Sequence, residues 1–243
     1  MENIYESTRT LGEYLLFHYG PREEQFPWAE GPLGALDFPR RTVEELIDLT
    51  SSIENALDVG CAVGRSSFVL AELADSVLGV DYSSSFIDAA KTILESGELK
   101  YEYHEEADRW KMGIASIATK PNNLHFEVGD ACNLRDDLGS FDLVHAANLL
   151  CRLPNPQTFL ARLNKLVSQG GQLLLTTPFT WLEEFTPREN WLNGEDCASA
   201  LKQILDPFFE LEHEINMPFL IREHKRKFQY TMSLGMRWRR KQA

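Results

Sequence analysis

Two glycines follow the first long apolar run of the chain, which extends from Ile53 to Val59. Gly60 and Gly64 lack the Cβ atoms that would keep a ligand away from the backbone, and the helical pattern after them brings unpaired N–H groups to the same place. Asp81 ends a second apolar run 17 residues after Gly64, a spacing at which a carboxylate accepts both ribose hydroxyls. These residue types and spacings predict a nucleoside that lies across the carboxyl ends of two adjacent parallel strands.

Polar residues also follow the next two apolar runs. Asp130 and Ala131 come after the run Leu124–Val128, and Asn148 comes after the run Phe141–Ala147. The order of these signals along the chain is more specific than any one of them. A carboxylate in such a position also serves as a turn residue or a helix cap, so a structural role stays open for Asp81 and Asp130.

The elements that must position these residues alternate between strands and helices. Five strands in such an alternation predict a parallel sheet with right-handed crossovers. Two final strands, at about 208–215 and 225–234, have no helix between them and predict an antiparallel pair at the edge. The expected fold is α/β, with a seven-stranded, mostly parallel sheet and an antiparallel edge strand. The five alternating strands are Ile53–Val59, Val77–Asp81, Leu124–Val128, Phe141–Ala147 and Gln172–Thr177.

Two segments lie outside this alternation. Residues 1–52 combine a crowded apolar helix pattern with a long loop rich in aromatic residues and proline, which predicts a helical lid or pocket wall. Residues 99–121 form an insertion before strand three, where alternating residues predict a hairpin. The length of 243 residues predicts one domain, residues 1–243, made of the lid at 1–52 and a core at 53–243.

The charge of the chain limits its partners. A net charge of −13 argues against a nucleic-acid partner, which requires a basic surface. Eight basic residues nevertheless occur in the last 22 positions. We interpret them as part of a solvated strand pair and tail, with contact to an anionic substrate or partner as the alternative. They are Arg222, Lys225, Arg226, Lys227, Arg237, Arg239, Arg240 and Lys241.

The cysteines and the apolar runs indicate the compartment. The four cysteines are far apart, and no Cys-x-x-Cys pair or histidine cluster has the spacing of a zinc site. We therefore expect reduced thiols and no metal. Met1–Glu6 lacks the features of a signal peptide, and no apolar run approaches the roughly 20 residues of a membrane span. These features predict a cytoplasmic protein without a membrane partner.

The series of signals from Ile53 to Leu234 resembles that of the class I methyltransferases that use S-adenosylmethionine, which have a Rossmann-like fold. A dinucleotide dehydrogenase has the spacing Gly-x-Gly-x-x-Gly instead, and Ala62 and Val63 break that spacing here. The resemblance implies S-adenosylmethionine as the cofactor and S-adenosylhomocysteine as the product. Ala62 departs from the glycine that is commoner at its position.

The same resemblance implies the cofactor contacts. Those around the methionine moiety are Asp58, Gly60, Ala62, Gly64 and Asn148, with Asn148 near the transferred methyl group. Those at the nucleoside are Asp81 at the ribose, Tyr82 beside the adenine ring, and Asp130 and Ala131 at the adenine edge.

Five segments outside this frame are more distinctive: residues 13–20 (EYLLFHYG), 146–154 (AANLLCRLP), 176–186 (TTPFTWLEEFT), 217–224 (MPFLIREH) and 238–240 (WRR). They resemble the 4-mercaptohistidine N1-methyltransferase family, which provides the last enzyme of ovothiol biosynthesis. In many organisms that unit is the C-terminal domain of a larger iron-dependent sulfoxide synthase. Because this sequence contains no His-x-x-x-His-x-Glu iron site, the resemblance implies methylation alone and a functional link to a separate sulfoxide synthase.

The chemistry of such an acceptor assigns candidate roles to residues of these segments. Methyl transfer holds a nitrogen lone pair about 3 Å from the sulfonium methyl and excludes water. Arg152 is a candidate clamp for the carboxylate or thiolate, since guanidinium binds such groups in a fork. Glu183 or Glu184 is a candidate partner for the ammonium group.

Aromatic residues are the candidates for the walls around the imidazole. They are Tyr14, His18, Phe179 and Trp181, and Tyr14 or His18 is also a candidate to orient the ring or accept its proton. With Asn148 these two form the predicted catalytic set. Packing inside the core is the alternative for His18, Phe179 and Trp181, and a structural ion pair is the alternative for Arg152.

The sequence thus predicts a methyltransferase that acts on an imidazole nitrogen of 5(4)-thiohistidine and forms ovothiol A. One alternative is N- or O-methylation of another small molecule, and a second is a non-catalytic protein that binds a nucleoside. The general base, the ring nitrogen that is methylated, the oligomeric state and the roles of residues 99–121 and of the basic C-terminal segment stay open.

Overall fold

Seven strands form the central sheet of the protein, seen in a computed structural model that describes residues 4–242. Their order is β5-β2-β1-β6-β7-β9-β8. β9 runs antiparallel to both of its neighbours, whereas the pairs on the other side of β7 are parallel. This confirms the predicted fold class. The strands are β1 (Ile53–Val59), β2 (Ala74–Asp81), β5 (Leu124–Val128), β6 (Phe141–Ala147), β7 (Val167–Thr177), β8 (Phe209–His224) and β9 (Lys227–Arg240).

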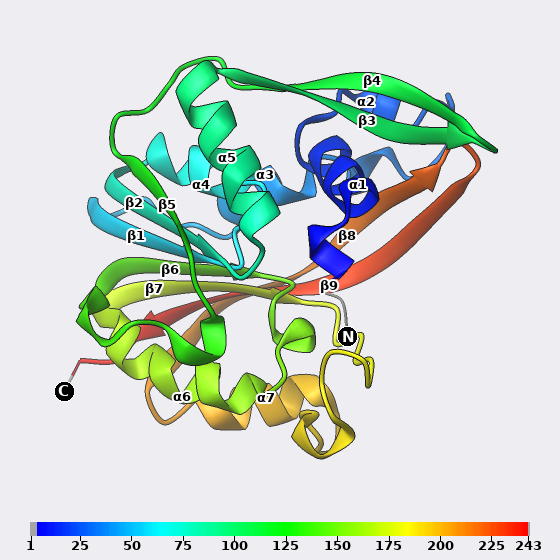
Figure 1. Cartoon of the computed structure of the whole chain (residues 1–243). Coiled ribbons are helices and arrows are strands. Elements are labelled where there is room, and N and C mark those ends of the chain that lie inside the picture. The colour runs from blue at the N-terminus through cyan, green and yellow to red at the C-terminus, as the bar shows by residue number, and fades with distance from the viewer. Residues whose placement is uncertain (1–3, 243) are drawn as a thin grey trace.

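Helices cover both faces of this sheet (Figure 1). α1, α3, α4 and α5 lie on one face, and α6 and α7 lie on the other. The buried side chains divide into two matching cores, one containing Leu15 and Ile87 and the other containing Phe159 and Leu201. Strands covered on both faces are buried along most of their length, as β1 and β6 are. The helices are α1 (Thr8–Tyr19), α2 (Arg22–Gln25), α3 (Phe38–Glu44), α4 (Arg65–Ala71), α5 (Ser84–Ser96), α6 (Pro156–Leu166) and α7 (Cys197–Leu205).

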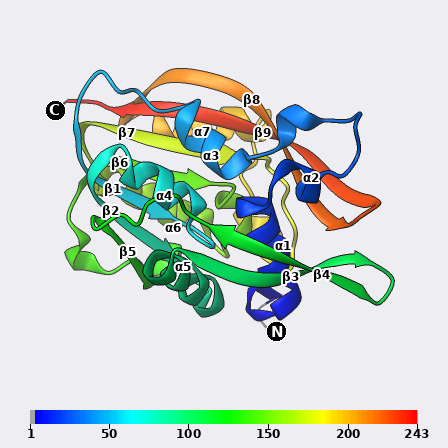
Figure 2. The ribbon, with the colours of Figure 1, turned by 90° about the horizontal axis from the view of Figure 1, so that it is seen from above.

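The insertion predicted at residues 99–121 is a two-stranded antiparallel hairpin of β3 (Glu98–Glu106) and β4 (Arg109–Ser116). It lies across α1, and its tip reaches the turn between β8 and β9 (Figure 2). There the backbone N–H of Lys225 donates to the carbonyl oxygen of Glu105 at 2.8 Å. The hairpin therefore joins the N-terminal helix to the far edge of the sheet.

The N-terminal region packs against this frame and differs in one respect from the expectation. Ser7 caps α1, because its hydroxyl accepts from the N–H of Thr10 at 3.1 Å. The pattern from Thr42 predicts the next helix, but α3 begins four residues earlier at Phe38, with Pro39 in its first turn. Thr42 consequently lies inside α3, buried against the sheet. Within residues 4–242, no helix is both long and apolar enough to cross a membrane.

The last two strands are longer than the sequence predicts. Residues 217–220 continue β8 instead of connecting two shorter strands, although Pro218 is among them. Proline is tolerated because β8 is the edge strand and has hydrogen-bonding partners on one side. On β9, Arg237 and Arg239 both pair with Glu212, which supports the interpretation of this basic segment as a strand pair.

Gly12 is the point at which α1 approaches β3 most closely, because an added Cβ would overlap with the carbonyl oxygen of Glu102. Alanine stabilises a helix by about 0.5–1 kcal/mol over glycine, but overpacking costs about 1–3 kcal/mol. We expect Gly12→Ala to lower the free energy of unfolding measured in urea. Gly34→Ala is the control, since nothing lies within 4 Å of its added Cβ. An unchanged or higher stability of Gly12→Ala would refute this close approach.

Candidate active site

The turn between β1 and α4 has an unusual backbone. Gly60, Ala62 and Gly64 have φ angles of 74°, 48° and 88°, in the left-handed region that favours glycine. The N–H groups of Gly60 and Cys61 donate to the carbonyl oxygen of Val80 at 2.8 and 3.1 Å, which ties the turn to the end of β2. Ala62 therefore adopts the conformation of the commoner glycine at a steric cost.

Asp81 lies beside this turn at the end of β2. Its carboxylate oxygens accept from the N–H groups of Ala62 at 2.8 Å and Ser83 at 2.9 Å. Burial raises the pKa of Asp81 to about 6, although these two hydrogen bonds favour the charged form. The carboxylate is thus rigidly held, and it titrates near neutral pH before a ligand binds.

This pKa predicts a pH dependence of cofactor binding. Ribose hydroxyls donate to a carboxylate, so binding favours the ionised Asp81 and becomes weaker as the pH falls through about 6. We expect the affinity for S-adenosylhomocysteine, measured by calorimetry, to fall by up to about tenfold per pH unit between pH 6 and pH 5. Asp81→Asn removes the titrating group and should flatten this profile. A wild-type profile that is flat over the same range would contradict the assignment of the ribose to Asp81.

A cavity of about 580 Å³ opens beside Asp81, within the size range of small-molecule sites. Gly64, which is also a predicted cofactor contact, does not line the cavity; it packs against the ring of Phe126, which an added Cβ would approach at 2.7 Å. The binding roles of all the predicted cofactor contacts stay predictions. The predicted cofactor contacts that line the cavity are Asp58, Gly60, Ala62, Asp81, Tyr82, Asp130, Ala131 and Asn148.

Four predicted substrate contacts line the same cavity: Tyr14, His18, Arg152 and Glu184. We call the part of the cavity that they line the acceptor end. Sequence reasoning missed most of its aromatic walls, which come from distant segments. Phe17, Phe38 and Phe219 lie in separate segments of the sequence, and no pattern in those segments indicates that they line one cavity. The missed aromatic residues of the lining are Tyr5, Phe17, Phe38, Phe86, Phe185 and Phe219.

Three predicted substrate contacts lie outside the cavity, which corrects their expected placement. Trp181 stacks on Trp191 with ring centroids 6.4 Å apart, and Phe179 packs beside it against the core under α6 and α7. Glu183 points to solvent and pairs with Arg188 at 2.5 Å. Within the loop 179–186, Glu184 and Phe185 line the cavity, whereas residues 179–183 do not.

The carboxylate of Asp58 forms hydrogen bonds to two buried side chains. One of its oxygens lies 2.7 Å from Nδ1 of His145, and the other accepts from the hydroxyl of Ser67 at 2.6 Å. Nε2 of His145 lies 3.0 Å from Oγ1 of Thr42 on α3. Sequence reasoning missed His145, because its partners are 87 and 103 residues away in the chain. Asp58 thus joins β1, β6 and α4 beneath the cavity.

Asp130 has the capping role that was left open, since its Oδ1 accepts from the N–H of Cys132 at 2.8 Å. This hydrogen bond begins the short turn η3 (Ala131–Asn133) that follows β5. The structure shows the capping role of Asp130. Its contact to adenine, at the same end of β5, stays a prediction.

Asn148 follows β6 in a left-handed conformation, with φ of 51°. Its N–H donates to the carbonyl oxygen of Thr176 at 2.9 Å. Its Oδ1 accepts from the hydroxyls of Thr176 at 3.0 Å and of the fully buried Ser233 at 2.5 Å. Because both hydroxyls occupy the amide oxygen, the Nδ2 amino group is left to face the cavity as a donor.

Ser233→Ala tests this orientation of Asn148. The substitution removes one of two hydroxyls that hold the amide oxygen, and a hydrogen bond of this kind contributes about 1 kcal/mol. We expect a roughly fivefold loss of affinity for S-adenosylhomocysteine in calorimetry, and a fall of about 2–4 °C in the melting temperature. Ser168→Ala on β7 is the control, because its hydroxyl bonds to Ser140 at the surface. Equal affinities for all three proteins would rule out a positioning role for Ser233.

Of the two side chains predicted as proton acceptors, His18 is buried and Tyr14 is partly buried. Burial and the nearby charge of Arg65 lower the pKa of His18 to about 3, so its ring is neutral at physiological pH. Burial also raises the pKa of Tyr14 far above its usual range, so its hydroxyl keeps its proton. Nδ1 of His18 is buried and has no hydrogen-bond partner in the part of the chain that the structure describes.

Arg152 is anchored at the acceptor end by one nitrogen of its guanidinium. Nη1 donates to the carbonyl oxygens of Cys151 and Thr180, each at 3.0 Å. The guanidinium lies over the ring of Phe185 at 4.9 Å. These contacts fix the cation at the cavity without neutralising it, so the predicted alternative of a structural ion pair finds no support among the described residues.

The N-terminal turn η1 (Ile4–Glu6) lies over the cavity. The ring of Tyr5 meets those of Tyr14, Phe86 and Phe185 at centroid distances of 5.8–6.0 Å. The carboxylate of Glu6 accepts from N–H groups at the start of α5, at 3.0 and 3.3 Å. No group of three or more His, Cys, Asp or Glu side chains within the described range is placed to hold a metal ion.

The sheet order, the left-handed turn after β1 and the acids at the ends of β2 and β5 are those of the Rossmann-like fold of class I S-adenosylmethionine-dependent methyltransferases. Solved structures share this fold. A SAM-dependent methyltransferase from Methanosarcina mazei is 17% identical, with a TM-score of 0.57 over 80% of this chain and 96% of that chain. The N-methyltransferase NodS from Bradyrhizobium japonicum, solved with S-adenosylhomocysteine, is 15% identical, with a TM-score of 0.55 over 96% of this chain and 99% of that chain.

Residues 57–175 match the model of the methyltransferase domain family. Among curated proteins, the ubiquinone biosynthesis O-methyltransferase of Coxiella burnetii is 30% identical over 135 residues, 56% of this chain and 47% of the relative. Its namesake from Dechloromonas aromatica is 28% identical over 136 residues, 56% of this chain and 48% of the relative. The chain thus spans about half the length of the curated relatives it matches. The predicted enzyme class and cofactor are confirmed.

Proposed function

We propose that this chain transfers the methyl group of S-adenosylmethionine to an imidazole nitrogen of 5(4)-thiohistidine, forming ovothiol A and S-adenosylhomocysteine. The cofactor supplies an electrophilic methyl on a sulfonium, which becomes a neutral thioether after transfer. The proposal rests on the resemblance of the five distinctive segments and on the chemistry of the acceptor end. A separate sulfoxide synthase is the proposed source of the substrate.

The observation that carries the choice of a nitrogen acceptor is the protonation of Tyr14 and His18. Neither accepts a proton readily near neutral pH, because burial keeps the tyrosine protonated and the histidine neutral with a pKa of about 3. An imidazole nitrogen offers its lone pair without losing a proton first. A phenol requires deprotonation before it attacks, so the acceptor end favours the imidazole.

The remaining groups suit the charges of an amino acid with a thiolate. Arg152 presents a fixed guanidinium to a carboxylate or thiolate. Glu184 lines the same end with a carboxylate of the sign that an ammonium group needs. His18 lines the same end with a neutral ring, which adds no charge that would oppose these pairings.

The aromatic walls and η1 assist by excluding water from the reacting atoms. The rings of Tyr14 and Phe86 lie 4.7 Å apart, and those of Tyr14 and His18 lie 6.0 Å apart in a stacked arrangement. Such walls hold a planar ring in one orientation, and orientation is a large part of the advantage of an enzyme in a displacement. The methylated ring loses its proton to solvent after release.

O-methylation of another small molecule is the second candidate, because the curated relatives are named ubiquinone biosynthesis O-methyltransferases. The similarity to them covers about half of this chain. The family match at residues 57–175 leaves out Tyr14, His18 and Glu184, which line the acceptor end. The relatives therefore support the cofactor chemistry more strongly than the choice of acceptor.

A panel of acceptors distinguishes the two candidates. The purified protein is incubated with S-adenosylmethionine and one of 5-thiohistidine, histidine or catechol, and mass spectrometry detects methylated product and S-adenosylhomocysteine. We expect turnover with thiohistidine and at least tenfold less with histidine, which lacks the thiolate. Turnover of catechol but not of thiohistidine would replace the proposal with O-methylation. A failure to bind S-adenosylhomocysteine in calorimetry would reject both.

A further inference from the structure

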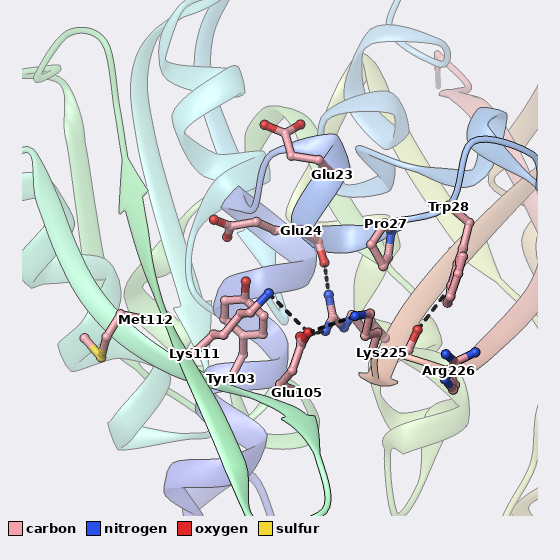
Figure 3. A pocket seen from close by; sticks show the side chains of 11 residues that line it. Glu23, Glu24, Pro27, Trp28, Tyr103, Glu105, Lys111, Met112, Lys225 and Arg226 are labelled. Carbon is pink, nitrogen blue, oxygen red and sulfur yellow. Dashed lines mark hydrogen bonds and ion pairs between the residues drawn. The ribbon is translucent and has the colours of Figure 1, made fainter.

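A second cavity, of about 670 Å³, lies at the tips of the two hairpins (Figure 3). Three segments that are distant in the sequence form it: residues 23–28, the β3–β4 hairpin and the β8–β9 turn. It shares no lining residue with the cavity that contains Asp81. The methyl-transfer site therefore does not account for it.

Hydrogen bonds from side chains to backbone carbonyls hold the rim of this cavity together. Nη1 of Arg222 donates to the carbonyl oxygen of Glu24, and the indole N–H of Trp28 donates to that of Lys225 at 3.2 Å. Arg222 also forms a buried ion pair with Glu105, which Lys111 approaches at 3.1 Å. The cavity is thus a preformed frame of fixed shape.

Two charged groups on the rim are not used by this frame. Within residues 4–242, Oε2 of Glu24 is buried and has no hydrogen-bond partner. The guanidinium of Arg226 lies over the ring of Trp28 at 5.1 Å, and in the described part of the chain it takes part in no ion pair. Figure 3 shows the Glu24 carboxylate and Arg226 on opposite sides of the group of lining side chains. The frame therefore carries one unused charge of each sign at its two ends.

We propose that this cavity binds a small zwitterion of peptide length, with its ammonium group at Glu24 and its carboxylate at Arg226. Lys225, which forms an ion pair with Glu105 at 3.7 Å, adds positive charge to the lining next to Arg226. A sphere of this volume is about 11 Å across, and an extended tripeptide spans about 10 Å. The opposite charges and the size of the cavity suit a peptide of about three residues with free termini.

The ligand lies against an apolar surface between these charges. The ring of Trp28 and the side chains of Pro27, Tyr103 and Met112 line the cavity. Trp28 is 37% exposed and Met112 is 58% exposed, so both have surface that a ligand would cover. A peptide backbone with small or apolar side chains therefore matches the middle of the cavity, and its termini match the ends.

Calorimetry with triglycine tests the proposal, in the presence of saturating S-adenosylhomocysteine. N-acetyl-triglycine lacks the ammonium group, and triglycine amide lacks the carboxylate. We expect saturable binding of triglycine and at least tenfold weaker binding of both blocked peptides. No saturable binding, or binding of N-acetyl-triglycine as tight as that of triglycine, would overturn the proposal, the second result indicating a simple anion site.

Two substitutions assign the binding to this cavity. Glu24→Gln and Arg226→Ala should each weaken triglycine binding at least tenfold without lowering the melting temperature, since neither side chain holds the frame. Arg188→Ala is the matched control, because Arg188 also lies over a tryptophan, Trp191 at 5.4 Å, on a different part of the surface. Wild-type affinity in both Glu24→Gln and Arg226→Ala would overturn the proposal. This experiment does not depend on the acceptor that the enzyme methylates.

Discussion

Replacing Asp58 with alanine should lower the free energy of unfolding by about 3–5 kcal/mol, the cost of removing one partner from a buried pair. The carboxylate binds His145 and Ser67 at 2.7 and 2.6 Å, and all three side chains are almost fully buried. Alanine leaves the imidazole and the hydroxyl without their carboxylate partner inside the protein. Urea denaturation followed by circular dichroism measures the change.

Asp137→Ala is the control for this substitution. Its side chain is 81% exposed and pairs with Arg135 at the surface, where an ion pair contributes little. We expect the stability of Asp137→Ala to stay within about 0.5 kcal/mol of the wild type. A loss below 1 kcal/mol in Asp58→Ala would show that the link that Asp58 makes between β1, β6 and α4 is not important for folding.

Asp81→Ala should weaken the binding of S-adenosylhomocysteine by about 1–3 kcal/mol, or roughly 5- to 150-fold. The alanine cannot accept the ribose hydroxyls, and it also removes the partner of the Ala62 N–H, which holds the left-handed turn. Calorimetry at pH 7.5 measures the change. Asp75→Ala, at an exposed position of the same strand, is the control and should bind like the wild type. Unchanged affinity in Asp81→Ala would place the ribose elsewhere.

The sequence predicts the layers of this fold because each layer has a local cause. Apolar runs that alternate with helical patterns dictate a parallel sheet, and the glycines and acids lie at strand ends where that topology gathers them. The hairpin at β3 and β4 was likewise predictable from its alternation. The extent of β8 and β9 was not, because Pro218 looks like the end of a strand until the position of β8 at the edge is known.

The cofactor side of the site was more predictable than the acceptor end for the same reason. Gly60, Asp81 and Asn148 each follow a recognisable strand, whereas Tyr5 and Phe219 reach the cavity through tertiary packing. Trp181 was a candidate wall around the imidazole, with packing as the alternative, and in the structure it stacks on Trp191, which lies ten residues further along the chain. His145 depends on contacts made across most of the chain, so no local pattern marks it.

Most of the acceptor end of the cavity comes from other parts of the chain than the predicted cofactor contacts, and this has a consequence for how such enzymes diversify. The predicted cofactor contacts Asp81 and Asp130 lie within residues 57–175, as does Arg152, whereas Tyr14, Glu184 and Phe219 lie outside this region. Mutations in the segments outside residues 57–175 can change which molecule is methylated without changing the predicted cofactor contacts. An engineer seeking a new acceptor should therefore randomise those segments and leave the turn after β1 untouched.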